Sequence, residues 1–238
     1  MLPKLVTPKY DMIIPSTRET VTYRPYVVKE EKILLIAMES KDNNQIEKAV
    51  LDIIERCIES DIDLDKLTTF DIEFMFVTLR SKSVGEGITL NMKCENETCD
   101  HTNEVKINLD ELNVANLDEE EPIDTHIKLT DDISVDLKWA TMNDRISSSD
   151  SKTETEAVIQ MVAKSIETIY SGEEIHSTKD VAKKEVVEFV ESLSTDQFQS
   201  IAEVLSKAPY LNYKLKYDCN KCGHDHVREL NGLADFFQ

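Results

Sequence analysis

Glycine is scarce in this chain, with five among 238 residues, and none lies in a Walker loop or a G-x-G-x-x-G pattern. Backbone cradles for phosphate depend on such closely spaced glycines, so the sequence does not indicate a nucleotide-binding enzyme. The G-x-S-x-G and H-E-x-x-H patterns of hydrolases are also missing. His126 and His176 are isolated, and each is expected to be a surface or packed histidine rather than a general base. We therefore expect no enzymatic activity, no catalytic residue and no organic cofactor.

The chain also lacks long apolar runs and has few basic side chains compared with acidic ones. No stretch approaches the roughly 18 consecutive apolar residues of a membrane-spanning helix, and the first ten residues lack the apolar core of a signal peptide. Acidic side chains outnumber basic ones by 47 to 27, which gives a formal charge of −20. Such a charge repels phosphate backbones and anionic membrane surfaces. We expect a cytoplasmic protein with neither nucleic acid nor membrane as a partner.

The first 84 residues are expected to form an arm and a helical block. Residues 1–27 contain four prolines, which remove backbone donors and favour extended geometry. This segment is predicted to be an extended N-terminal arm, able to add a strand to the sheet edge of a partner. Residues 28–84 are predicted to be helical, and the clearest helical spacing is that of Ile46, Val50, Ile53, Ile54, Cys57 and Ile58. Cys57 is expected in the core, where a free cysteine behaves as a small hydrophobe.

From Gly85 the period of the apolar residues changes to two, which predicts strands. Residues 85–110 indicate a hairpin with Cys94 and Cys99 at its tip. Its alternating apolar residues are Ile88, Leu90 and Met92 before the first cysteine and Val105, Ile107 and Leu109 after the second. Residues 111–150 combine an acidic linker with another β-hairpin, which is expected to turn at Asp131 and Asp132.

Residues 151–209 are expected to form a second helical block. Its three apolar faces are Val158, Val162, Ile166 and Ile169, then Ala182, Val186, Phe189, Val190 and Leu193, and finally Phe198, Ile201, Ala202 and Leu205. Thr153 with Glu156, and Ser194 with Gln197, have the spacing of a capping box. Residues 210–238 return to strand alternation around Cys219 and Cys222, followed by a tail. The fold class expected is α+β: two mainly helical blocks around a split, zinc-ribbon-like pair of cysteine hairpins, plus a small β-hairpin.

Cys94, Cys99, Cys219 and Cys222 are predicted to bind one structural Zn²⁺ ion. In a reducing compartment close cysteine pairs more often hold a metal than form disulfides, and two hairpin tips together supply four thiolates. Two alternatives stay open, an ancestral site that no longer binds metal and redox chemistry. The strands that flank both pairs disfavour redox chemistry, because a reactive dithiol normally lies at a helix N-terminus.

Three histidines, His101, His224 and His226, lie close to the cysteines in the sequence. They could substitute as ligands or surround the site, but we expect them to be exposed polar turn residues. Four cysteine ligands leave no coordination position for water or substrate, so a catalytic metal is not expected.

The order of features, from the proline-containing arm through "RPYVVKEEKILLIA" to the split cysteine pairs in an acidic chain, resembles a known family. It is that of the baseplate hub assembly proteins of T4-like contractile-tailed phages, which contains gene product twenty-six. The resemblance is strongest over residues 23–80, and the order of features extends it over the whole chain.

This resemblance implies a non-enzymatic phage tail assembly protein that acts as a chaperone or scaffold in baseplate hub assembly, in the cytoplasm of the infected bacterial host. The partners it implies are other baseplate hub and hub-assembly proteins. A permanent structural subunit of the hub in the virion baseplate is one alternative. A zinc-ribbon regulatory or accessory protein is another, which the charge of −20 disfavours because a nucleic-acid-binding regulator would present a basic face.

Overall fold

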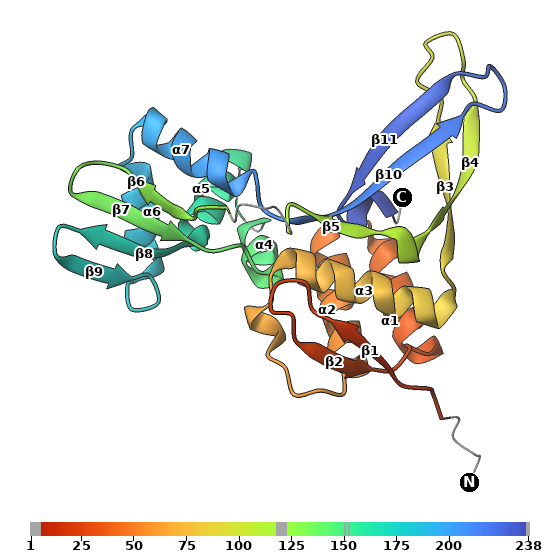
Figure 1. Cartoon of the computed structure of the whole chain (residues 1–238), viewed down its shortest axis with the longest axis horizontal. Helices are drawn as coiled ribbons and strands as arrows, with labels where there is room; N and C mark the ends of the chain where they lie inside the picture. The colour runs from red at the N-terminus through yellow and green to blue at the C-terminus, as the bar shows by residue number, and fades with distance from the viewer. Residues whose placement is uncertain (1–5, 118–122, 150, 152, 237–238) are drawn as a thin grey trace. The chain divides into compact units, whose positions relative to one another are not determined.

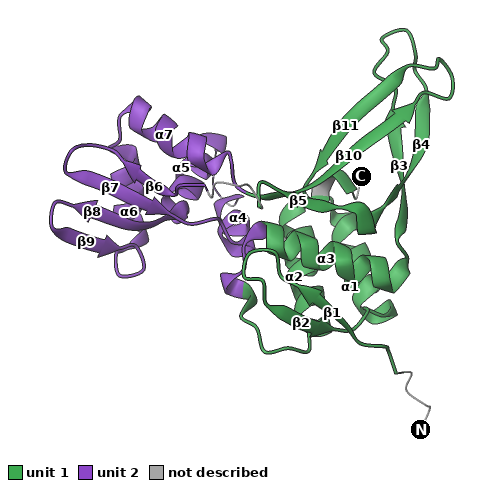
Figure 2. Cartoon of the chain, viewed as in Figure 1, with its two compact units in different colours: residues 1–64, 70–117, 209–238 green, residues 65–69, 118–208 purple. Residues whose placement is uncertain are grey.

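A computed structural model describes residues 6–117, 123–149, 151 and 153–236 (Figure 1). The chain divides into two compact units, coloured separately in Figure 2. The first contains residues 1–64, 70–117 and 209–238, and the second contains residues 65–69 and 118–208. Each unit contains helices and small sheets, so the α+β class predicted from the sequence is confirmed. No helix in the part of the chain described here is long and apolar enough to cross a membrane.

The helices of the first unit carry much of its core. They are α1 (Val28–Ser40), α2 (Asn43–Cys57) and α3 (Thr69–Val84). The side chain of Asp42 accepts a hydrogen bond from the Asn44 amide and caps the start of α2. Cys57 is fully buried on the apolar face of this helix, as predicted, and burial raises its pKa to about 11. A thiol with such a raised pKa is a packing residue and not a nucleophile.

The N-terminal segment is extended but is not a free arm. Strands β1 (Tyr10–Ile13) and β2 (Thr20–Tyr23) pair antiparallel with each other. The side chains of Met12, Ile14, Val21 and Tyr23 are buried in the first unit. At the turn, the backbone amide and the hydroxyl of Ser16 both donate to the carboxylate of Asp71 in α3, at 2.9 and 2.6 Å. Over residues 10–23 the predicted arm is extended, and its apolar side chains pack on this chain's own core; residues 1–5 lie outside the described part.

The cysteine hairpins follow the predicted alternation. Strands β3 (Gly87–Lys93) and β4 (Thr102–Asn108) pair antiparallel, and Ile88, Leu90 and Met92 point inward. Strand β10 (Tyr210–Asp218) pairs with β11 (Asp225–Asn231) on one side and with β5 (Asn113–Ala115) on the other. The sequence assigned β5 to the linker, because a strand of three residues is too short to show a period.

The second unit is a four-stranded antiparallel sheet packed with helices. Its strands, in the order β6-β7-β8-β9, are β6 (His126–Lys128), β7 (Ile133–Leu137), β8 (Ile166–Ser171) and β9 (Glu174–Ser177). Its helices are α4 (Met142–Ser149), α5 (Glu154–Ser165), α6 (Lys183–Glu191) and α7 (Thr195–Leu205). The predicted hairpin at residues 126–137 is confirmed. The acidic residues 118–122 before it lie outside the described part.

One helix of the second unit is shorter than predicted. Ile166 and Ile169, assigned to a helical face, belong to β8, because α5 ends at Ser165. β-Branched and aromatic side chains dominate β8 and favour a strand where a neighbouring strand can pair with it. The predicted helix starts are confirmed: Thr153 accepts from the Glu156 amide, and Ser194 and Gln197 form a reciprocal capping box. The core of the unit consists of Ile127, Val135, Leu137, Val162, Ala163, Ile166, Val186, Val190 and Ile201.

Candidate metal centre

The four cysteines predicted to act together meet at one point of the first unit. Their sulfur atoms all lie within 4.8 Å of one another. Across the two turns, the Sγ atoms of Cys94 and Cys222 are 3.7 Å apart, and those of Cys99 and Cys219 are 3.8 Å apart. All four are free thiols; three are buried and Cys222 is exposed. The predicted convergence of two turns 120 residues apart is therefore confirmed.

Both cysteine turns are closed by the same type of backbone hydrogen bond. The amide of Cys94 donates to the carbonyl of His101 at 2.8 Å, and the amide of Cys219 donates to the carbonyl of His224 at 2.9 Å. In the second turn Gly223 has a φ of +70°, a left-handed conformation that costs glycine no steric penalty. Each turn is thus fixed by its own hairpin, and the sulfur atoms are held at the two tips.

Contacts between the hairpins hold the two tips together. The side-chain oxygen of the buried Asn103, in β4, accepts a hydrogen bond from the Asn220 amide at 2.9 Å. The side-chain amide of Asn103 also donates to the Met92 carbonyl in β3 at 3.5 Å. On the other side, the guanidinium of Arg228 in β11 pairs with the carboxylate of Glu95 at 2.7 Å. Polar contacts therefore link the two halves independently of the sulfur atoms.

The environment of the thiols is uneven. Burial opposes ionisation of Cys219, but the amides of Cys222 and Lys221 donate to its sulfur and lower its pKa. Burial raises the pKa of Cys94, although the amide of Asn96 donates to that sulfur. Amide donors aimed at sulfur stabilise thiolates, whereas four thiolates this close repel one another. A cation among them would remove that repulsion.

The donor set fits a tetrahedral metal ion. Sulfur atoms at about 2.3 Å from a tetrahedral Zn²⁺ ion are about 3.8 Å from one another. The two pairs across the turns are at 3.7 and 3.8 Å, and all four sulfur atoms lie within 4.8 Å of one another. Four thiolates favour Zn²⁺ over the hard cations Mg²⁺ and Ca²⁺, which select oxygen ligands. The arrangement can hold one ion and leaves no position for a substrate.

Among the three nearby histidines, His224 is exposed as expected and His101 is half-buried. His226 in β11 is instead buried and stacks on Tyr217, with ring centroids 4.6 Å apart. His226 faces inward because strand alternation places it opposite Tyr217 in the register of the hairpin. The group of ligand atoms close enough to share an ion contains the four cysteines and, among the described residues, no histidine.

Sequence reasoning missed the residues that join the halves. Asn103 stands at an alternating position of β4 that apolar residues would normally occupy, and this polar residue at an inward position was the available signal. Glu95 and Arg228 gave no signal, because nothing in a single sequence relates charges 133 positions apart.

The fold and the site define an α+β protein of two units, with a four-cysteine cluster built from two separate stretches of one unit. The chain matches the family described as T4 bacteriophage base plate protein over residues 7–238, and it belongs to that family. It is also 25% identical over 233 residues to Baseplate hub assembly protein gp26 of Enterobacteria phage T4, an alignment that covers 97% of each chain. No solved structure matches it.

Proposed function

We propose that this protein acts in assembly of the phage baseplate hub, as a non-enzymatic chaperone or scaffold that binds other hub proteins. The observation that carries this proposal is the collinear match to a hub assembly protein over 97% of both chains. A match over nearly the full length includes both units and both cysteine turns, so the proposal concerns the whole chain.

The four cysteines are proposed to hold a structural Zn²⁺ ion. The sulfur separations support it, and so does the discontinuous unit that the cluster closes. Zinc in such a site stabilises a fold and supplies no open position for chemistry. Metal analysis of protein purified without chelators should find about one zinc per chain. Chains that contain no zinc and show no zinc uptake would contradict this part of the proposal.

Partner binding is proposed to use the N-terminal part of the first unit. Most of the large apolar side chains that are exposed in the described structure lie between residues 6 and 36: Val6, Tyr10, Ile13, Val27, Val28, Leu35 and Ile36. Leu35 and Ile36, in α1, are 53% and 57% exposed. Neighbouring exposed apolar side chains such as these two are typical of protein interaction surfaces.

The test is co-purification of the tagged chain from infected cells, with captured proteins identified by mass spectrometry. Wild-type protein should capture baseplate hub proteins, and Leu35→Glu with Ile36→Glu should lose most of that capture. Ile175→Glu is the matched control, because Ile175 is 69% exposed but belongs to the second unit. Deleting residues 1–27 would be a poor test, since it removes core side chains such as Tyr23. Capture of no hub protein by the wild type would overturn the proposal.

A permanent structural subunit is the second candidate, favoured by the family description, which names a base plate protein. The two roles differ in what the finished particle contains. Quantitative mass spectrometry of purified virions should find this chain missing or far below the copy number of hub subunits if it is a chaperone. Stoichiometric recovery from tails would establish the structural role instead.

A further inference from the structure

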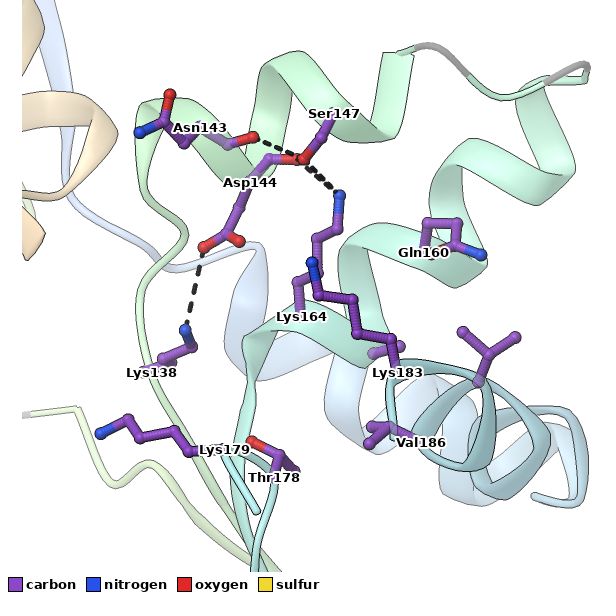
Figure 3. A pocket seen from close by; sticks show the side chains of 12 residues that line it. Lys138, Asn143, Asp144, Ser147, Gln160, Lys164, Thr178, Lys179, Lys183 and Val186 are labelled. Atoms are coloured by element: carbon purple, nitrogen blue, oxygen red, sulfur yellow. Dashed lines mark hydrogen bonds and ion pairs between the residues drawn. The ribbon is translucent and has the colours of Figure 1, made fainter. Parts of the chain in front are cut away.

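The second unit contains a cavity of about 290 Å³ that concentrates positive charge in a strongly acidic chain. Four lysines border it: Lys138, Lys164, Lys179 and Lys183. Figure 3 shows them coming from different elements: Lys138 follows β7, Lys164 belongs to α5, Lys179 follows β9 and Lys183 begins α6. Asp144 is the only carboxylate among the described residues that line this cavity.

The carboxylates nearby offset only part of this charge. Asp144 accepts from the amide and hydroxyl of Thr141 at 3.2 and 3.0 Å, so it is engaged at the start of α4, and its distance from the Lys138 ammonium is 3.8 Å. Lys179 pairs with Glu167 at 3.2 Å, but its side chain is 73% exposed. Exposed ion pairs of this kind contribute little interaction free energy. Lys183 has no ion-pair partner among the residues that the structure describes.

The interior of the cavity is held firmly by Lys164. Its ammonium donates to the carbonyl oxygen of Asp144 at 3.1 Å and to the hydroxyls of Ser147 and Ser148 at 2.7 and 3.0 Å. These bonds join α5 to α4 and fix one charged end of the cavity. Ammonium groups brought together in this way repel one another, and a cleft lined with one sign of charge concentrates ligands of the opposite sign.

We infer that this cavity binds a small oxyanion with several negative oxygens, of the phosphate or the carboxylate type. Lysine ammoniums serve as point charges for such groups. Gln160 also lines the cavity, and its side-chain amide is a neutral hydrogen-bond donor suited to the same oxygens. The volume lies at the lower end of ligand pockets, about 300 Å³, and therefore suits a small ligand.

This site does not depend on the proposed assembly role. It lies within residues 138–187 of the second unit and shares no residue with the cysteine cluster. Success or failure of the experiment below is thus distinguishable from the outcome of the co-purification test.

The experiment is calorimetric titration of the full chain with pyrophosphate and, separately, with citrate at low salt. Saturable binding at one site is expected for at least one of them, and the ligand that binds more tightly identifies phosphate or carboxylate as the preferred group. Lys183→Gln should weaken binding about tenfold, since it removes a charge-assisted hydrogen bond. Lys184→Gln is the matched control, because Lys184 is the next residue, is exposed, and pairs with Glu188 at 3.1 Å outside the cavity.

Both variants should fold, since removing a positive charge from the first turn of a helix does not oppose the helix dipole. Unfolding curves check this for each variant. A control affinity within about twofold of wild type, with the tenfold loss confined to Lys183→Gln, supports the site. The inference is overturned if neither anion saturates, or if both variants weaken binding equally, because the effect would then be one of overall charge.

Discussion

The two units reach a compact state by different routes. The second is formed almost entirely from one stretch of chain, residues 118–208, and its apolar cluster comes from residues 127–201. The first is assembled from three separate stretches. Its sheet β11-β10-β5 combines one strand that precedes residues 118–208 in the sequence with two strands that follow them. Closing a long loop costs conformational entropy that local contacts do not recover. The comparison teaches that the discontinuous unit depends on contacts between distant stretches of chain, and the cysteine cluster is one place where two of these stretches meet.

The largest effect is expected from Cys219→Ser. If the cluster holds zinc, this change should lower the free energy of unfolding of the first unit by on the order of 5 kcal/mol, because structural zinc contributes about 10–16 kcal/mol in zinc-finger peptides. Hydrogen exchange read by mass spectrometry should show loss of protection in β10 and β11. Trp139, the single tryptophan, lies in the second unit, so its fluorescence transition should not move.

Cys57→Ala is the control for that experiment. Cys57 is fully buried but does not belong to the cysteine cluster. The Cys57→Ala substitution should lower the free energy of unfolding by about 1 kcal/mol through lost packing, and it should leave the zinc content unchanged. Equal effects of the two substitutions on stability and metal content would contradict the closure role.

The reverse experiment creates a void in the apolar core of the second unit. Ile166→Ala removes a fully buried side chain from its core and should cost about 2–5 kcal/mol. Here the fluorescence transition of Trp139 should shift to lower urea concentration, while metal content and protection of β10 stay as in the wild type. A loss of metal in Ile166→Ala would show that the units do not stabilise themselves separately.

A smaller difference in stability is expected between alanine substitutions at two glycines that have similar φ angles. Gly232 in the first unit has a φ of +69° and Gly172 in the second a φ of +60°. An added Cβ at Gly172 meets open space, whereas at Gly232 it would lie 3.2 Å from the Glu73 carboxylate. Both alanine variants should lose about 1–2 kcal/mol from backbone strain, and Gly232→Ala should lose more in urea unfolding. The reverse order would contradict the crowding at Gly232.

The smallest effect concerns the acid response of the first unit. Burial would raise the pKa of Glu30, but the Val27 amide and the Arg24 guanidinium donate to its carboxylate and lower it below 4.5. Stability from this ionised group is thus present above pH 4.5 and lost as the pH falls through the lowered pKa. The stability difference between wild type and Glu30→Gln should therefore shrink from pH 7 to pH 3. Glu31→Gln is the control, and any metal loss in acid cancels in the difference.

Much of the fold could be predicted because it is local. Alternation located β3, β10 and the hairpin at residues 126–137, and capping residues located the starts of α5 and α7. Prediction failed where pairing with a distant segment determines the secondary structure. Ile166 and Ile169 continue a helical spacing, but pairing with β7 makes them a strand.

The candidate site also has a part that the sequence could predict and a part that it could not. The four cysteines were identifiable from residue type and spacing alone, and their joint location followed from the chemistry of tetrahedral thiolate sites. The contacts that join the two halves, Asn103 to Asn220 and Glu95 to Arg228, depend on a tertiary register that no local pattern encodes. The lysine cavity could not be predicted for the same reason, since its lysines lie in two helices and two loops spread over residues 138–183.

The position of Cys219 and Cys222 has a consequence for the order of events on the ribosome. Residues 118–208 emerge before the C-terminal hairpin has been synthesised. The second unit can therefore fold while translation continues, but the first cannot be completed until residues 209–238 have left the exit tunnel. In a chain truncated before residue 219, the unit begun first would be the one left unfinished.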